Sequence, residues 1–313
     1  MIANTSERAD ALPTSSLDWL NETWRLARWQ LFLARRRLMS KILLILLLVF
    51  YAIVVGFVAL IYVTVANSSN AGEEAGTIRN LVAFPTSLSL AGIYTRIVGV
   101  LLLCVLVGAL TGSEYGFGTL RLILPRGTSR GQLLVAQLVA VALLALAAAG
   151  FMLLVATLVG IVLGPILGAT LLFPSVATWA EIVKFWLALS FHLFGYALIA
   201  YFAGTLGRSV LAGVALPLGY LFLEVFIGNV VVNVVALFLL GTPDAAERVR
   251  HIPDWFLGSN TSAIMTLVGQ YPLNLDLGGT SFSLVRALAV ALLYCVLLVG
   301  GSYLLLTRRD VTD

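Results

Sequence analysis

Six long apolar stretches, separated by shorter polar segments, dominate the pattern of the chain. A helix that crosses the hydrocarbon core of a bilayer needs about 20 apolar residues, each rising about 1.5 Å. The pattern therefore predicts six spans, at residues 42–66, 97–110, 133–163, 185–206, 210–240 and 287–306. We expect the second span to begin nearer Ser89, with Arg96 near the outer headgroups or buried against protein. The third and fifth spans are long enough to be tilted or broken.

Composition supports this pattern. Sixty per cent of the 313 residues are apolar, 11% are charged and the mean hydropathy is +1.03, which a soluble domain could not shield from water. We predict an all-α integral membrane protein: a cytoplasmic N-terminus at 1–41, a six-helix transmembrane domain at 42–306 and a cytoplasmic tail at 307–313. Cys104 and Cys295 lie inside apolar runs, which favours reduced thiols and argues against disulfides or a metal cluster. No cleavable signal peptide is predicted.

The distribution of Lys and Arg predicts the orientation. With six spans, thirteen of the nineteen basic residues fall on the side of the N-terminus and six on the other. The larger group is Arg8, Arg25, Arg28, Arg35, Arg36, Arg37, Lys41, Arg121, Arg126, Arg130, Arg208, Arg308 and Arg309. Both termini are therefore expected in the cytoplasm, with the protein in the plasma membrane.

Residues 17–39 interleave tryptophan with arginine and do not resemble a span. Trp19, Trp24 and Trp29 alternate with Arg25, Arg28 and Arg35, and Leu20, Trp24, Ala27 and Leu31 fall at helical spacing on one face. Tryptophan and arginine hold a helix in the headgroup plane. We predict an amphipathic elbow helix at the membrane surface, with Ser15 and Asp18 as a possible capping pair; the alternative is a basic flank that only fixes topology.

The segment 112–130 joins the second and third spans on the predicted cytoplasmic side. It reads G-S-E-Y-G-F-G-T-L-R-L-I-L-P-R-G-T-S-R. Leucine and isoleucine give it an apolar face and arginines a basic one, bracketed by turn residues. The pattern predicts a short amphipathic helix parallel to the membrane; the alternative is a plain cytoplasmic loop in which Glu114 is solvated.

This segment resembles the first cytoplasmic loop of the permease subunits of type-two ABC exporters, whose form is E-x-x-x-G-T-x-x-x-x-x-x-P-x-x-R. Glu114, Gly118 and Thr119 match it in place, whereas Pro125 comes one residue earlier and Arg130 slightly later than the strict spacing. The resemblance implies a coupling helix that docks on a separate ATPase through Leu120, Arg121, Ile123 and Leu124, with Glu114 bracing the loop against the elbow helix or a basic group. It also implies a second permease copy or a paralogue as a partner, and export as the direction.

The chain itself lacks the sequence of an ATP-hydrolysing site. A phosphate-binding loop needs Gly-Lys followed by Ser or Thr. The two lysines, Lys41 and Lys184, do not follow glycine. We therefore expect no catalytic residues, metal site or cofactor in this chain, no nucleic-acid partner, and ATP and Mg bound by the partner ATPase.

Two ionisable residues lie within predicted spans. Glu224 is in the fifth span, where a carboxylate costs about 2.5–3.5 kcal/mol on insertion scales, so it should face protein or a water-filled cavity. His192 lies in the fourth span. We assign both to the translocation path or to the dimer interface; the alternative is a purely structural role, with the carboxyl neutral or hydrogen-bonded to a neighbouring helix.

Glycines recur at four-residue spacing at 108, 112 and 116 and at 160, 164 and 168, a pattern that favours close packing of helices. The outer loop 241–283 mixes charges with apolar residues. We expect short helices there that lie at, or dip into, the outer interface, forming either an extracellular gate or a covering loop.

Two other functions compete with the permease. A secondary transporter or channel would usually have more spans, an internal repeat or several intramembrane charges. An intramembrane enzyme is less favoured, because Glu73 and Glu74 lie on an outer loop and the sequence has no H-E-x-x-H motif.

Overall fold

The computed structural model describes residues 16–67, 72–116, 129–170, 175–238, 251–268 and 283–308. These residues are helical almost throughout and include no strand. Six helical segments are long and apolar enough to cross a membrane: Leu38–Ala66, Ser87–Gly116, Arg130–Ile166, Val176–Gly207, Val210–Gly228 and Leu284–Arg308. The prediction of six spanning helices in an all-α protein is therefore confirmed, which supports a multi-pass membrane protein.

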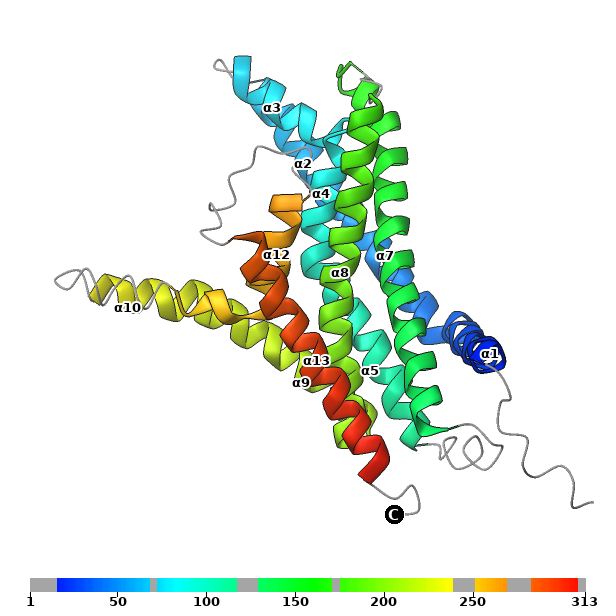
Figure 1. Ribbon diagram of the computed structural model, residues 1–313. Coiled ribbons are helices and arrows are strands. Elements are labelled where there is room, and N and C mark those ends of the chain that lie inside the picture. Colours follow the sequence, from blue (N-terminus) through cyan, green and yellow to red (C-terminus); the bar gives the residue numbers. More distant parts are fainter. Residues whose placement is uncertain are drawn as a thin grey trace, which may run out of the picture.

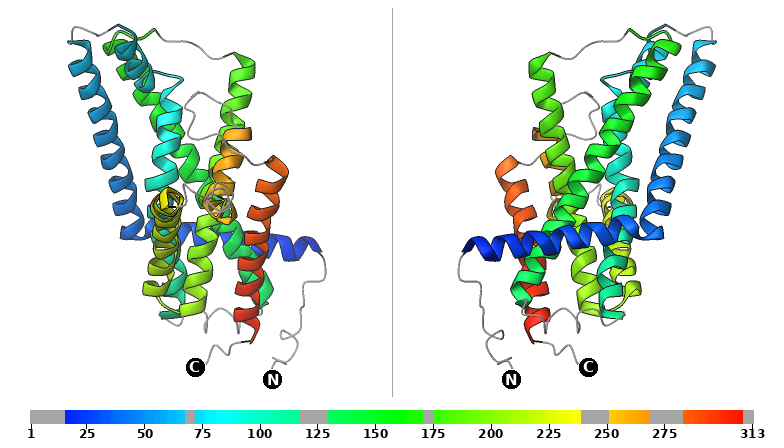
Figure 2. Two further views of the ribbon diagram at one scale, coloured as in Figure 1. Left: turned by 90° about the vertical axis from the view of Figure 1, so that its left-hand side faces the viewer. Right: turned by 90° about the vertical axis from the view of Figure 1, so that its right-hand side faces the viewer.

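Helix α1 (Ser16–Arg36) precedes the first span, α2 (Leu38–Ala66), and runs across the bundle at a steep angle to the other helices (Figure 2). It packs against α7 (Arg130–Ile166) through its small residues: Ala27 is fully buried, and Thr23 and Ala34 are nearly so. Leu20, Trp24 and Trp29 are about half exposed. The predicted apolar face is thus divided, with Ala27 against protein and the larger side chains on the outer surface. Arg28 is exposed, and Trp19 is partly buried.

The second span consists of α4 (Ser87–Tyr94), a π-helical turn at Thr95–Gly99 and α5 (Val100–Gly116). It begins at Ser87, close to the expected Ser89. Arg96 is partly buried within the π-helical turn. The third span, α7, has 37 residues and is α-helical throughout its length, so its glycines do not break it. At about 1.5 Å per residue, α7 is about 55 Å long and exceeds a hydrocarbon core of about 30 Å.

The glycines at four-residue spacing serve close packing within the chain. A Cβ at Gly108 would overlap the backbone carbonyl of Gly213 on α9 (Val210–Val225), and a Cβ at Gly112 would overlap the backbone of Ser209. Gly160 of α7 packs in the same way against Ser87. Close packing within the chain is therefore confirmed at these glycines, and α5 and α9 form a tightly packed pair, whereas nothing lies within 4 Å of a Cβ at Gly116.

The fifth span bends outward beyond its midpoint. Helix α9 passes into a π-helical segment, η4 (Phe226–Val231), and then into α10 (Val232–Phe238), which points away from the bundle (Figure 1). Pro217 lies inside α9. The break expected in this span thus lies at the π-helical segment, after the proline. A π-helical turn contains an extra residue, which is a common cause of helix bending.

The last described elements are two short helices and the sixth span. A 3-10 turn, η5 (Pro253–Trp255), leads into α12 (Leu257–Val268), and α13 (Leu284–Arg308) follows. Helix α12 packs between α13 and α8 (Val176–Gly207), and Asn260 is fully buried. Short helices were expected in 241–283, and two are present in its described part; α12 lies within the bundle and does not merely cover it.

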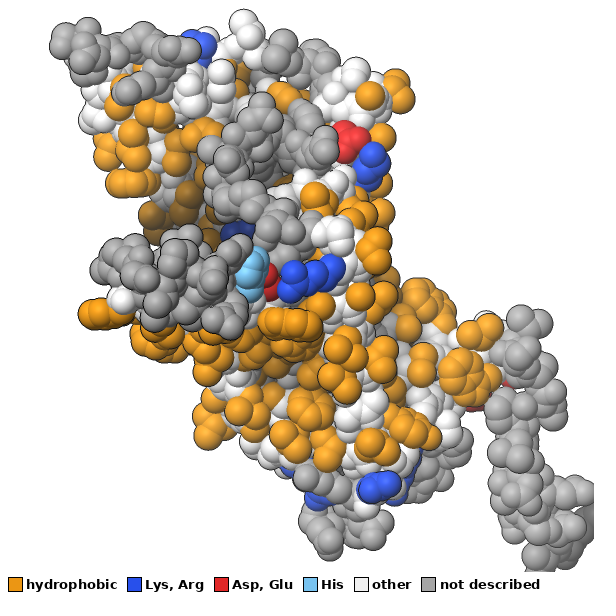
Figure 3. All heavy atoms as spheres, turned by 60° about the vertical axis from the view of Figure 1, so that its left-hand side comes forward, with side chains coloured by type: hydrophobic (Ala, Val, Ile, Leu, Met, Phe, Trp, Pro, Cys, Tyr) orange, Lys and Arg blue, Asp and Glu red, His pale blue; other side chains and the backbone are white. Residues whose placement is uncertain are grey.

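The surface is consistent with a bilayer environment. Figure 3 shows hydrophobic side chains over much of the lower half of one face, with basic side chains at the lower end and others at mid-height and near the top. Large apolar residues of α2, such as Ile45, Ile53 and Phe57, are about half exposed. Such a continuous apolar surface on a water-soluble protein would cause aggregation, whereas in a membrane it contacts lipid.

Candidate functional site

A buried polar cluster holds the start of α12, and we call it the α12 latch. It comprises His192 and Tyr196 of α8, Tyr220 and Glu224 of α9, and the first turn of α12. Three elements far apart in the sequence therefore meet at one set of hydrogen bonds, at the depth of the spans.

Helix α9 supplies two acceptors for the first turn of α12. Tyr220 and Glu224 lie four residues apart, so they share one face of the helix. The Leu257 N–H donates to Tyr220 Oη over 3.0 Å, and the Ser259 N–H donates to Glu224 Oε1 over 3.1 Å. The first N–H groups of a helix have no partner within it and carry its positive end, so a carboxylate there is favourable.

Helix α8 closes the cluster from the other side. Tyr196 Oη donates to Glu224 Oε2 over 2.6 Å, and His192 Nδ1 lies 2.7 Å from the Thr261 hydroxyl. The rings of His192 and Tyr196 meet edge to face, with centroids 5.1 Å apart. His192 and Glu224 therefore have different partners, and both hold α12.

The α12 latch leaves no room for a larger residue at its centre. A Cβ at Gly258 would overlap both Tyr196 Oη and Glu224 Oε1. The Leu257 side chain, which is fully buried, covers Gly195 of α8. Glu224 therefore has hydrogen-bond donors from α8 and α12, as a polar side chain among apolar spans requires.

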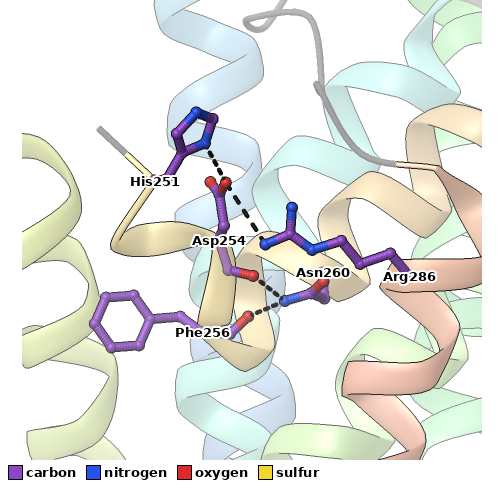
Figure 4. A network of polar contacts seen from close by, with 5 residues as sticks. All are labelled: His251, Asp254, Phe256, Asn260 and Arg286. Carbon is purple, nitrogen blue, oxygen red and sulfur yellow. Dashed lines mark hydrogen bonds and ion pairs between the residues drawn. The ribbon is translucent and has the colours of Figure 1, made fainter. Parts of the chain in front are cut away.

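A second network fixes the turn before α12 (Figure 4). Asp254 is nearly buried; its Oδ2 lies 2.7 Å from His251 Nδ1 and 3.8 Å from an Arg286 nitrogen of α13. The Asn260 amide donates to the carbonyl oxygens of Asp254 and Phe256, each over 2.8 Å. These contacts tie η5 to α12 and to α13, so the start of α12 is held from several sides.

A further polar cluster lies at the other end of the bundle, where α5 ends. Glu114 accepts a hydrogen bond from the Gln137 amide of α7, and Gln137 Oε1 accepts one from Tyr201 of α8 over 2.6 Å. Gln30 of α1 lines the same small cavity. Arg37 donates to the Ser113 hydroxyl over 2.6 Å. The last turn of α5 is therefore hydrogen-bonded to α7 and to Arg37 at the junction of α1 and α2, and Gln137 links it onward to α8.

The start of α7 is fixed as well. Ser129 Oγ accepts from the Gln132 N–H as an N-cap, and Arg130 donates to the carbonyl oxygens of Leu306 and Thr307 at the end of α13, over 2.7 and 3.1 Å. Gln132 donates to the Trp19 carbonyl of α1 over 3.4 Å. The end of α13 thus lies beside the start of α7, as an even number of spans requires.

The residues predicted to couple the loop to an ATPase fall into two groups. Glu114 and Arg130 lie in the described part of the chain, at the two anchored ends of the loop. The residues between them that carry the resemblance lie outside the described residues: Gly118, Thr119, Leu120, Arg121, Ile123, Leu124 and Pro125. Ser15 of the expected capping pair also lies outside them, as does the end of the tail after Arg308.

The sequence analysis missed several latch residues, notably Tyr196, Tyr220 and the first turn of α12. Their signal is present in the spacing, because His192–Tyr196 and Tyr220–Glu224 are both polar pairs four residues apart within apolar spans. The run G-S-N-T-S-A at 258–263 has the small and polar residues that pack between membrane helices.

Within the described residues, no group of three His, Cys, Asp or Glu side chains could hold a metal ion. Comparison with known proteins adds no assignment: no protein-family model matches the chain, and no curated protein matches it significantly.

Proposed function

We propose that the chain is the membrane-spanning permease subunit of an ATP-binding-cassette exporter, which forms the translocation path and couples it to a separate ATPase. The observation that carries the proposal is the anchoring of the motif-bearing loop. Glu114 ties its first end to α7, Ser113 ties it to Arg37 at the junction of α1 and α2, and Arg130 ties its second end to α13. A force applied to this loop would reach three spans and α1 at once.

A physical route connects this loop to the α12 latch. The loop continues from α5, and α5 packs backbone to backbone against α9 at Gly108 and Gly213. Helix α9 carries Glu224, which holds α12. Closely packed helices transmit displacement because their contacts do not deform continuously. In the proposed cycle, ATP-driven movement of the loop shifts the α5–α9 pair, releases the latch and lets α12 act as an outer gate.

The expected arrangement in the cell follows from the same proposal. Both termini and the 112–130 loop lie in the cytoplasm, and α1 is the elbow helix at the inner surface of the plasma membrane. Its exposed Leu20, Trp24 and Trp29 contact the bilayer there. Two permeases, identical or paralogous, assemble with two ATPases.

The deciding experiment pairs the chain with the ATPase encoded in the neighbouring reading frame. The two are co-expressed, purified together and assayed for ATP hydrolysis. Leu120→Glu with Leu124→Glu should abolish co-purification while membrane insertion is unchanged. Val176→Glu, at an exposed position at the opposite end of the bundle, is the matched control and should leave the complex intact. Loss in both variants, or in neither, contradicts the docking role of the loop.

Glu224 favours a second candidate, a proton-driven secondary transporter, because an ionisable group among spans often marks an ion path. Proteoliposomes separate the two functions. The ABC permease with its ATPase transports on addition of ATP without an ion gradient. A secondary transporter responds to a pH gradient without the ATPase, and Glu224→Gln abolishes that response.

A further inference from the structure

An apolar cavity lies at the corner between α1 and α2. Its volume is about 350 Å³, within the range of about 300–1,000 Å³ that is usual for ligand pockets. Helices α1, α2, α5 and α7 and the π-helical turn all contribute to its walls, which include Leu31, Leu47, Leu103, Phe151 and Met152. The cavity is therefore suited to a hydrocarbon chain.

A basic hollow adjoins this cavity. It has a volume of about 800 Å³ and is lined by Phe32, Arg35, Arg36, Ser40, Lys41 and Leu44. Arg35, Ser40 and Leu44 also line the apolar cavity, so the two spaces are contiguous. An elongated amphiphile could lie with its charged end among the cations and its apolar end between the helices.

The positive charge of the hollow favours an amphiphile whose charged end is negative. Arg35, Arg36 and Lys41 make no ion pair with an acid in the part of the chain that the structure describes. Arg35 and Arg36 lie in the last turn of α1, where the negative end of the helix stabilises cations. This stabilisation explains neither the presence of Lys41 on α2 nor the cavity beside these residues. Arg36 also lies over the Phe32 ring, 4.7 Å from its centroid, which leaves its charge unneutralised. Cations without an acidic partner at a membrane surface attract anionic headgroups.

We propose that this corner binds one anionic phospholipid, with its phosphate on Arg35, Arg36 and Lys41 and an acyl chain in the cavity between α1, α2, α5 and α7. The occupant is a lipid and not a soluble anion, because the hollow opens beside Leu44 and Ile45 of α2, which are exposed on the apolar surface. The lipid fills the space between α2 and the rest of the bundle. This site is independent of whether the chain transports anything.

The test uses the purified full chain in nanodiscs of phosphatidylcholine that contain a small fraction of phosphatidylglycerol with a photoreactive diazirine on its acyl chain. After illumination, labelled peptides are measured as the fraction of probe is raised. Labelling should concentrate on peptides that contain Phe151 and Met152. A phosphatidylcholine probe with the same chain should label them weakly.

Two double variants, each lacking two positive charges, distinguish binding at this site from general electrostatic attraction between the protein and anionic lipid. Each cation near a membrane surface contributes about fivefold to lipid affinity, so R35Q/K41Q should raise the half-saturating probe fraction about 25-fold. R25Q/R28Q removes two exposed charges from the same helix, away from the hollow, and should change it less than twofold. Ala148→Phe, which fills the cavity, should remove labelling of Met152 and keep headgroup selectivity.

Three results would overturn the proposal. One is equal labelling of the cavity by the two lipid probes, which would mean that any chain enters without headgroup selection. Another is an equal effect of the two double variants. The third is efficient disulfide formation between chains through Leu44→Cys, which would show that a second copy covers the corner. The charge variants lie on the surface, so this test remains decisive even if Ala148→Phe fails to fold.

Discussion

The carboxylate of Glu224 on α9 accepts the backbone N–H of Ser259, in the first turn of α12, over 3.1 Å. A side chain of one span thus caps a short helix that enters the bundle after that span. The first N–H groups of a helix need a hydrogen-bond acceptor, and a carboxyl group among membrane spans needs a donor. One contact between α9 and α12 meets both needs. Separating α12 from α9 leaves the Ser259 N–H without its acceptor and leaves Glu224 with Tyr196 as its side-chain partner.

Removal of the Glu224 carboxylate should destabilise the folded bundle. Glu224→Leu keeps a similar volume and leaves the Ser259 N–H and the Tyr196 hydroxyl without their acceptor, at about 1–3 kcal/mol for each buried group. The measurement is the free energy of unfolding on titration of mixed micelles with a denaturing detergent. Since α9 stays in the micelle when the fold is lost, the insertion cost of the carboxylate largely cancels.

A double-mutant cycle isolates the Tyr196–Glu224 hydrogen bond. Hydrogen bonds between membrane helices contribute about 0.6 kcal/mol on average and at most about 1.7 kcal/mol, so Tyr196→Phe with Glu224→Leu should show coupling in this range. Tyr62→Phe is the control, because Tyr62 donates to the Leu167 carbonyl, away from the latch. Its effect should add to that of Glu224→Leu within about 0.5 kcal/mol. If the effects of the single variants add in both cycles, the hydrogen bond between Tyr196 and Glu224 does not exist.

Gly258→Ala and Gly219→Ala should have effects of opposite sign. A methyl group at Gly258 must displace Tyr196 or Glu224, and overpacking of this kind costs about 1–3 kcal/mol. At Gly219 nothing lies within 4 Å of the added carbon, so the substitution in a helix should stabilise by about 0.5–1 kcal/mol. Thermal unfolding of the two proteins in one detergent measures both. Equal melting temperatures would show that the start of α12 is not tightly packed.

Exchanging the carboxylate of Glu114 and the amide of Gln137 should distinguish loss of their hydrogen bond from repulsion between two carboxylates. Gln137→Glu alone sets two carboxylates against each other, at a cost on the order of 2 kcal/mol or more. The double variant Glu114→Gln/Gln137→Glu restores one amide facing one carboxylate, and the acid at 137 can still accept from Tyr201. Stability should fall in the single variant and largely recover in the double. Failure to recover would mean that Glu114 needs its own position, beside Arg37 and Gln30.

The spans were the most predictable part of the fold. Their apolar runs exceed what any soluble helix would carry, and lipid enforces a helix by leaving backbone groups no other partner. Their ends were less predictable. The fourth span begins at Val176 and not at 185, because Glu181 and Lys184 pair over 2.8 Å within the helix and do not end it.

The site was predicted only in part, because its geometry depends on contacts between distant segments. Glu224 and His192 stood out as costly residues in apolar surroundings, whereas their partners are a tyrosine, a threonine and backbone N–H groups that carry no charge signal. Helix α12 was assigned to the outer loop, since its polar composition resembles that of a loop. Only the neighbouring spans reveal that Asn260 and Thr261 are buried.

The orientation can be tested with two serines that cap helices at opposite ends of the bundle. Ser129 caps α7 and Ser175 caps α8; both are exposed, and each accepts one backbone N–H of the helix that follows. Cysteine at either position should therefore cost a similar amount, about 1 kcal/mol. In intact cells, a membrane-impermeant maleimide should label Ser175→Cys and should reach Ser129→Cys only after permeabilisation. The reverse result would put the anchored loop outside the cell, where no ATPase could act on it, and the permease proposal would fail even if every contact described above were correct.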